Sequence, residues 1–236
     1  MGTEDGRNGS LGEREMEQAL ITLLAEEAAR IGITLGPPEL AQFAVFYDEF
    51  QIWNAKMNLT AVDAGPPFII RHFIDSLLAL PSIPPAATTL LDLGTGGGMP
   101  GIPLEIADKT LKVTLLDSSR KKTSFLRHVL IKLGKSDVRV ITGRAEDQLE
   151  DHDQQKLYDV VISRATFKLS QFLTLGNAFV RKEGVIIAMK GREWRKEKEE
   201  AENVHAYDQL RLTEVREILL PHYEEIRALL VYRKDG

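Results

Sequence analysis

Residues 91–101 read Leu-Asp-Leu-Gly-Thr-Gly-Gly-Gly-Met-Pro-Gly and continue a short apolar run. The stretch carries Asp92, Gly94, Gly96 and Gly98 in the pattern Asp-x-Gly-x-Gly-x-Gly. Glycine has no Cβ, so the backbone of such a loop can take positive φ angles and approach a bound molecule closely. A strand that ends in a glycine-rich loop is typical of nucleotide-binding α/β folds, although a tight strand-to-helix turn would look the same. The stretch therefore favours a ligand site at the end of a buried strand.

The loop differs from the glycine-rich motifs that bind polyphosphates. The dinucleotide motif Gly-x-Gly-x-x-Gly needs a third glycine where Met99 stands, and Pro100 and Gly101 interrupt the helix start that should follow. The full P-loop pattern, Gly-x-x-x-x-Gly-Lys-Ser/Thr, is absent from the chain. An uncharged, close-packed loop suits a nucleoside that bears an amino acid better than it suits a polyphosphate.

Apolar runs alternate with helical stretches on the carboxyl side of the loop. After the run at 88–94 come KVTLLDS (112–118), VRVITG (138–143), YDVVISRA (158–165) and GVIIAMKG (184–191), with helical patterns at 101–107, 120–133 and 168–182. Nearly continuous apolar strands that alternate with helices predict a parallel sheet covered on both faces. Two further runs, 210–220 and 223–233, predict a closing antiparallel hairpin. The pattern predicts an α/β Rossmann-like fold with a mostly parallel, seven-stranded sheet.

Three helical patterns, at 13–31, 38–56 and about 68–80, precede the first strand, and a proline-rich linker at 81–85 follows them. We expect residues 1–12 to form a disordered tail, residues 13–85 a helical cap and residues 86–236 the α/β domain. We expect the cap and the α/β domain to pack as one compact unit.

Composition excludes several classes of site. The chain has 236 residues, a net charge of −5, five scattered histidines and no cysteine, so we expect no disulfide, no cysteine nucleophile and no metal site. No apolar run reaches the roughly 20 residues of a membrane span, and the N-terminus lacks the features of a signal peptide. We expect a soluble cytoplasmic protein with no membrane partner.

Polar residues follow three more of the predicted strands. Asp117 ends the second strand, where an acid could receive a pair of ribose hydroxyls or, with Ser118 as the alternative, cap the next helix. After the third strand, Glu146 could accept a bond from an adenine amino group while the backbone at Ala145 meets the ring, or it could begin a solvated helix. Arg164, after the fourth strand, would face the ligand crevice unless it extends to the surface.

Taken together, these motifs resemble one known family, the bacterial small-subunit ribosomal RNA guanine-N7 methyltransferases, formerly called glucose-inhibited division protein B. The matching segments are DLGTGGGMPGIPL, the DS..KK..FL segment at 117–126, GRAE, SRA, MKG, NLT at 58–60 and RHFIDSL at 71–77, all between about 50 and 191. The chain departs from the family at Gly97 and Met99, and at Thr166-Phe-Lys-Leu after SRA, which concerns the acceptor pocket.

The resemblance implies a class I fold with an N-terminal helical cap, and S-adenosylmethionine as methyl donor with S-adenosylhomocysteine as product. It also implies cofactor contacts at Gly94, Met99, Ala145, Glu146 and Arg164, in addition to the loop residues and Asp117. The implied substrate is the guanine at nucleotide 527 of 16S ribosomal RNA, free or in a small-subunit assembly intermediate. We expect the protein to act as a monomer.

Two basic clusters, at 120–135 and 190–198, stand out from the acidic average and favour contact with phosphates. The candidate RNA-binding residues are Asn58, Arg71, His72, Lys121, Lys122 and Lys190. Arg71 and His72 could instead pair locally with Asp75, and the lysines could form a solvated helix face. No acid–base pair stands out, so no catalytic residue is assigned.

Two other functions fit the same sequence. A methyltransferase of a protein or small molecule would use the same cofactor loop, and a non-catalytic RNA-binding module would keep the basic clusters. The intact glycine loop argues against the second of these.

The first prediction concerns the glycine loop. S-adenosylmethionine should bind at one site per chain, and Gly96→Asp should abolish binding because a charged side chain would fill the space of close approach. Isothermal titration calorimetry measures both. Saturable binding of NAD without binding of the methyl donor would contradict the assignment.

Overall fold

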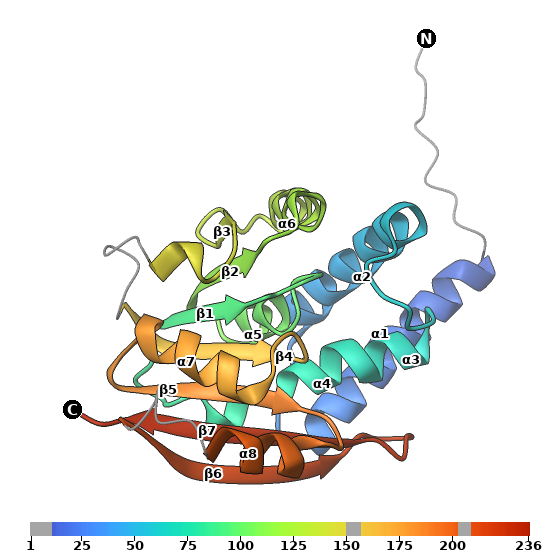
Figure 1. Ribbon diagram of the computed structural model, residues 1–236. Coiled ribbons are helices and arrows are strands. Elements are labelled where there is room, and N and C mark those ends of the chain that lie inside the picture. Colours follow the sequence, from blue (N-terminus) through green and yellow to red (C-terminus); the bar gives the residue numbers. More distant parts are fainter. Residues whose placement is uncertain (1–10, 150–156, 203–208) are drawn as a thin grey trace.

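The sheet determines the architecture in the computed structural model, which describes residues 11–149, 157–202 and 209–236. Its strands are β1 (Thr89–Leu93), β2 (Lys112–Asp117), β3 (Arg139–Thr142), β4 (Tyr158–Arg164), β5 (Val180–Lys190), β6 (Leu210–Leu219) and β7 (Ile226–Lys234). They lie in the order β3-β2-β1-β4-β5-β7-β6, with β7 antiparallel to both of its neighbours and the other pairs parallel (Figure 1). The predicted mostly parallel, seven-stranded sheet with an antiparallel hairpin is confirmed.

The strand order reverses direction at β1. From β1 the chain proceeds outward to β2 and β3, and then returns to β4 on the other side of β1. In open α/β sheets, ligands bind in the crevice outside the carboxyl ends of the strands at such a switch point. The loops after β1, β2, β3 and β4 therefore meet at one edge, as the sequence predicts.

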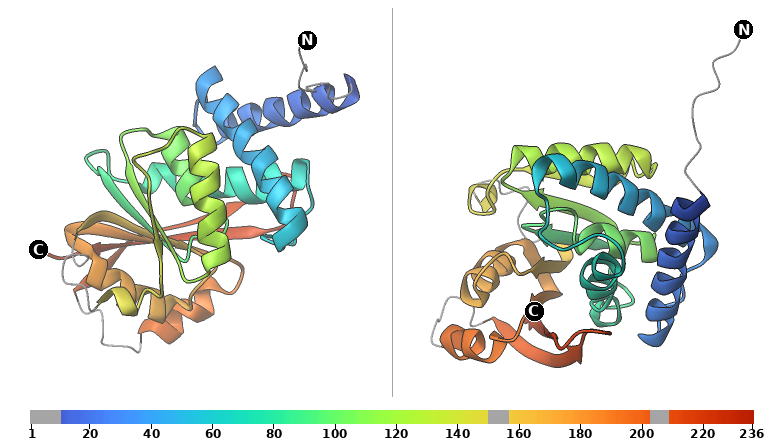
Figure 2. Two further views of the ribbon diagram at one scale, coloured as in Figure 1. Left: turned by 90° about the horizontal axis from the view of Figure 1, so that it is seen from above. Right: turned by 90° about the vertical axis from the view of Figure 1, so that its right-hand side faces the viewer.

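Helices cover both faces of the sheet (Figures 1 and 2). One face carries α5 (Gly101–Ala107) and α6 (Arg120–Lys132), and the other carries α7 (Leu169–Phe179) and α8 (Trp194–Glu202). Alternate residues of β1 supply the two cores: Leu90 belongs to the first, and Leu91 and Leu93 to the second. The strand is apolar on both sides for this reason.

Two elements differ from the prediction. Helix α8 has no counterpart in it, because Trp194 and Ala201 are its buried residues and leave too sparse a pattern to detect. The helix predicted over 168–182 ends at Phe179, because the polar residues Arg181–Glu183 already belong to β5. Those residues are exposed, so their polarity hides the strand from a hydrophobicity pattern.

The N-terminal helices are α1 (Leu11–Arg30), α2 (Pro37–Met57), α3 (Pro66–Phe68) and α4 (Asp75–Leu77). Helix α1 begins two residues before the predicted start, and residues 1–10 of the predicted tail lie outside the described residues. A single helix over 68–80 was wrong: a π-helix, η1 (Ile69–Ile74), separates α3 from α4, and a 3₁₀ turn, η2 (Leu80–Ser82), ends the segment. Ile69, Ile70, Phe73 and Ile74 are all buried, so the apolar pattern marks a buried helical segment but does not distinguish a π-helix from an α-helix. Such π-helical turns are frequent at functional sites.

An aromatic cluster joins the N-terminal helices to the sheet. The Phe50 ring of α2 lies 4.8 Å from Phe68 and 5.4 Å from Phe125 of α6, between ring centroids. It also lies against the glycine loop, where a Cβ on Gly97 would come within 2.6 Å of the ring. Phe50 therefore packs α2 directly onto the loop that follows β1.

The second prediction concerns this ring. Phe50→Ala should lower the free energy of unfolding by about 3–5 kcal/mol, because it leaves a cavity among aromatic rings that are themselves buried. The control is Ile52→Ala on the same helix, whose side chain is 53% exposed; its effect should stay within about 0.5 kcal/mol. Urea denaturation gives both values, and equal effects would contradict the packing role.

Candidate functional site

The carboxylate of Asp92 lies beneath the glycine loop. Its Oδ2 accepts the hydroxyl of Thr95 at 2.6 Å and the backbone N–H of Gly101 at 2.9 Å. Gly96 and Gly98 take φ angles of 61° and 88° between these two anchors. The side chain is fully buried and lines none of the cavities described below, so Asp92 positions the loop instead of making the predicted direct contact.

Burial raises the pKa of Asp92 to about 6, although its bonds to Thr95 and Gly101 act in the opposite direction. Its Oδ1 has no hydrogen-bond partner among the described residues. Gly98 also faces inward, because a Cβ there would lie 2.6 Å from Ile102 Cδ1. The predicted contact residues Asp92 and Gly98 thus shape the loop from inside.

Asp117 lies at the carboxyl end of β2 and faces the loop. Its Oδ2 accepts the N–H of Gly96 at 2.9 Å, and its Oδ1 accepts the N–H of Ser119 at 2.8 Å. The cap of α6 is Ser119, whose hydroxyl accepts the N–H of Lys122, so neither Asp117 nor Ser118 is the N-cap. The carboxylate is left on the wall of two cavities.

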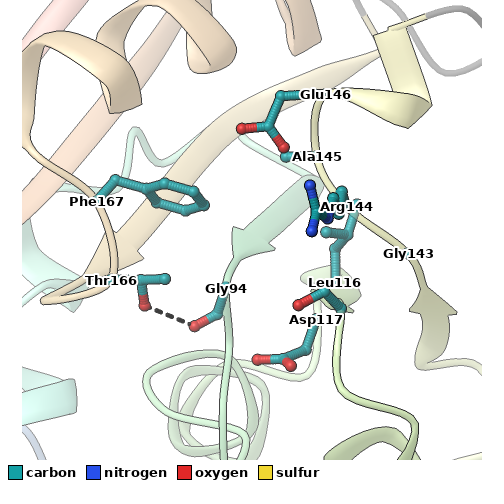
Figure 3. A pocket seen from close by; sticks show the side chains of 10 residues that line it. Gly94, Leu116, Asp117, Gly143, Arg144, Ala145, Glu146, Thr166 and Phe167 are labelled. Carbon is teal, nitrogen blue, oxygen red and sulfur yellow. Dashed lines mark hydrogen bonds between the residues drawn. The ribbon is translucent and has the colours of Figure 1, made fainter.

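Cavity A, of about 240 Å³, lies between the ends of β1, β2, β3 and β4. Its lining consists of Gly94, Leu116, Asp117, Ser118, Gly143, Arg144, Ala145, Glu146, Thr166 and Phe167. Figure 3 shows the Phe167 ring across the cavity from Arg144, with Asp117 at one end and Glu146 at the other. The Thr166 hydroxyl donates to the carbonyl of Gly94 at 2.9 Å, which fixes this wall against the glycine loop.

Cavity B, of about 210 Å³, adjoins cavity A and shares Gly94, Asp117 and Thr166 with it. The rest of its lining consists of Phe50, Leu59, Thr60, His72, Thr95, Gly96, Gly97, Met99, Lys122, Arg164 and Ala165. Cavity C, of about 390 Å³, shares His72, Arg164 and Ala165 with cavity B and continues between η1 and β7. The three cavities form a row along the carboxyl edge of the sheet.

Ion pairs hold the walls of cavity C. Asp75 is buried, with Oδ2 3.0 Å from Arg164 and Oδ1 3.1 Å from Arg227 of β7. Oε1 of Glu225 lies 2.5 Å from Nη2 of Arg71, and Oε2 of Glu225 lies 3.0 Å from Nη2 of Arg227. The local pairing with Asp75 that was considered for Arg71 is therefore wrong: Arg71 pairs with Glu225, which is distant in sequence, and Asp75 pairs with Arg164 and Arg227.

His72 stands between cavities B and C. Its Nδ1 lies 3.3 Å from Arg164 and its Nε2 lies 2.9 Å from the hydroxyl of Thr60. Burial, and then the charge of Arg164, lower the pKa of His72 to about 3, so the ring is neutral. A guanidinium can only donate, so Nδ1 accepts and the Nε2–H donates to Thr60.

The candidate RNA-binding residues lie in different surroundings. Asn58 is the C-cap of α2, and its left-handed backbone donates to the carbonyl of Asn54. Lys121 is exposed, whereas Lys122 lines cavity B, so the alternative of a solvated helix face does not hold for Lys122. The ammonium of Lys190 is buried and lies 2.7 Å from Glu197 and 2.5 Å from the carbonyl of Phe167, which leaves it little freedom to reach a phosphate.

Within the described part of the chain, no group of three or more His, Asp or Glu residues could hold a metal ion. Among the described helices, none combines the length and apolar character that crossing a membrane requires.

Comparison with known proteins identifies the family. Residues 39–225 match the family model GidB, rRNA small subunit methyltransferase G. The chain belongs to this family. A GidB relative from Syntrophus aciditrophicus, named ribosomal RNA small subunit methyltransferase G, is 40% identical over 214 residues, which are 90% of this chain and 89% of the relative. One from Acetivibrio thermocellus with the same name is 36% identical over 223 residues, 93% of this chain and 90% of the relative.

Solved structures show the same fold at lower identity. An O-methyltransferase from Bacillus cereus in complex with SAH has a TM-score of 0.62 and 19% identity, over 92% of this chain and 100% of that one. A predicted O-methyltransferase from Agrobacterium tumefaciens has a TM-score of 0.55 and 20% identity, over 70% of this chain and 80% of that one. The class I methyltransferase fold and the GidB family predicted from the motifs are confirmed, and so, at the level of the family, is the prediction of an rRNA methyltransferase.

Several lining residues of this GidB protein were not singled out from the sequence. Thr60 and Asp75 stand inside the NLT and RHFIDSL motifs, and that position was the available signal. Arg227 and Glu225 lie in none of these motifs. The antiparallel pairing of β7 with β5 brings them to the crevice.

The third prediction follows from the pKa of Asp92. Because this pKa is about 6 in the folded protein and 3.8 for an unperturbed aspartate, the folded state binds more protons between these values. Protonation of Asp92 stabilises the folded state fully below about pH 4, and this contribution is lost as the pH rises through 6. For a difference of two pKa units, the contribution to the free energy of unfolding is about 3 kcal/mol at most. The unfolding free energy of the parent minus that of Asp92→Asn should therefore fall between about pH 4 and pH 6 and then level off. Denaturant titrations over a pH series measure it, and a difference that stays constant with pH would contradict the assignment.

Proposed function

We propose that the protein transfers a methyl group from S-adenosylmethionine to N7 of a guanine in 16S ribosomal RNA. The observation that carries the proposal is the row of cavities A, B and C at the switch point of a GidB-family chain. Such a row offers places for a nucleoside, for its amino-acid end and for an acceptor base. The family's nucleotide 527 is the proposed target.

The residues present fit the cofactor. Leu116, Ala145 and Phe167 give cavity A apolar walls for a purine ring, and Asp117 stands at its end as an acceptor for ribose hydroxyls. Each carboxylate oxygen of Asp117 accepts one backbone bond and has a second lone pair available. A Cβ at Gly96 would meet no protein atom closer than 4.0 Å, so the loop backbone is open to the cavity at this point. When bound, the sulfonium supplies an electrophilic methyl group.

The acceptor needs little acid–base help. Guanine N7 has a free lone pair at neutral pH, so no general base is required, and the protein supplies orientation and electrostatics. The guanine ring gains positive charge during transfer. A neutral His72 at the junction of cavities B and C adds no opposing charge there, which agrees with its lowered pKa.

Arg164 is the proposed link between the cofactor and acceptor sides. It lines both cavities B and C, and it donates to the carbonyl of Arg71 at 3.1 Å as well as pairing with Asp75. These contacts set the distance between the β4 loop and η1, and therefore the width of the passage.

The RNA partner is proposed to present an unpaired or flipped-out guanine. N7 faces the deep, narrow major groove of an RNA helix, which side chains do not enter, so a paired base would be inaccessible. Exposed Lys121 and the surface around Arg71 are the proposed phosphate contacts. The substrate would be 16S RNA itself or a partly assembled small subunit.

The fourth prediction tests the reaction. The protein should transfer labelled methyl groups from S-adenosylmethionine to 16S RNA or small-subunit particles, and nuclease digestion should release the label as N7-methylguanosine. Label found on protein, on a small molecule or on another RNA base would contradict the acceptor. Binding of the RNA without any transfer would indicate a non-catalytic RNA-binding protein.

A further inference from the structure

Lys122 is a cation inside the crevice. It lies in the first turn of α6 and is half-buried, and it lines cavity B together with the glycine loop. Its Nζ lies 4.0 Å from the point where Gly96 would carry a Cβ. The ammonium is thus beside the part of the loop that is open to the cavity.

No side chain in the described part of the chain neutralises this ammonium. Asp117 shares the cavity, but its two oxygens accept the N–H groups of Gly96 and Ser119, and it forms no ion pair with Lys122 within 4.0 Å. Cations are also disfavoured in the first turn of a helix by its dipole. A lysine in these surroundings is suited to an anionic group that enters the cavity.

The other cation of cavity B is already engaged. Nη1 of Arg164 donates to Asp75 and to the carbonyl of Arg71, and Nη2 donates to His72. Its guanidinium is therefore held toward cavity C, which leaves Lys122 as the cation on the glycine-loop side of cavity B.

We propose that the ammonium of Lys122 binds the α-carboxylate of S-adenosylmethionine. The inference rests on the proposed function: if cavity A holds the nucleoside, the adjoining cavity B receives the amino-acid end, which carries one carboxylate. A carboxylate beside a lysine gains a charge-assisted hydrogen bond, and Gly96 leaves the approach open. Lys122 then recognises the cofactor, and of the two adjacent lysines only Lys121 keeps the RNA-docking role expected from the sequence.

The fifth prediction uses two ligands that differ only in this carboxylate: S-adenosylmethionine and its decarboxylated analogue. The parent should prefer S-adenosylmethionine. Lys122→Met should weaken its binding by about tenfold or more, the loss expected for one charge-assisted hydrogen bond, and should leave binding of the analogue unchanged or tighter. Lys122→Arg should keep the preference, because it keeps the charge. The matched control, Lys121→Met on the exposed neighbour, should change neither affinity. Calorimetry measures all of these.

The outcomes separate the two proposals. If the parent binds neither ligand, the proposed function fails. If the parent binds S-adenosylmethionine and Lys122→Met keeps the parent's preference, or weakens both ligands equally, the carboxylate contact is wrong. If Lys122→Met loses RNA affinity while its cofactor affinity is unchanged, Lys122 contacts an RNA phosphate and the proposed carboxylate contact is overturned.

Discussion

The carboxylate of Asp92 is buried beneath the glycine loop, where it accepts from Thr95 at one end of the loop and from Gly101 at the other. Removing a carboxylate from water is costly, and burial raises its pKa to about 6. The two bonds offset part of that cost and fix the ends of the loop. With the ends fixed, the N–H of Gly96 reaches Asp117, so the loop after β1 is joined to the end of β2 at the wall of cavities A and B.

The N-terminal helices supply part of the walls of the crevice at the edge of the sheet. Phe50 of α2 rests against Gly97, so α2 packs directly on the loop whose shape Asp92 sets. This packing brings Thr60 and His72 to the crevice, and the ion pairs of Asp75 tie η1 to both β4 and β7. The part of the crevice around cavities B and C is therefore assembled from three distant parts of the chain, and its geometry depends on the core beneath it.

The arginines and the lysine of the crevice lie in different parts of it. Arg164, Arg227 and Arg71 are engaged with Asp75 and Glu225 around cavity C. Lys122 stands apart from that network, beside the glycine loop. Arginine suits the first role because its planar fork holds several acceptors at once, and lysine suits the second because it is a compact point charge. The two cation types thus separate a rigid wall from a ligand contact.

The sequence by itself determined the sheet, the helices α5, α6 and α7 that cover it, and the edge where the loops meet. Buried parallel strands must be apolar on both faces. Gly94 and Gly96 lie just after β1, and Asp117 and Arg164 end β2 and β4, so their shared edge could be predicted. Only the tertiary structure decided which neighbouring side chains enter the crevice. Lys121 and Lys122 are indistinguishable in a sequence, yet successive residues of a helix point about 100° apart, so one is exposed and the other lines cavity B. Lys190 and Arg227 make the same point, because partners distant in sequence or on another element fix where their charges lie. Patterns along the chain report which residues are buried in helices and strands, whereas a site depends on contacts that form when separate elements pack.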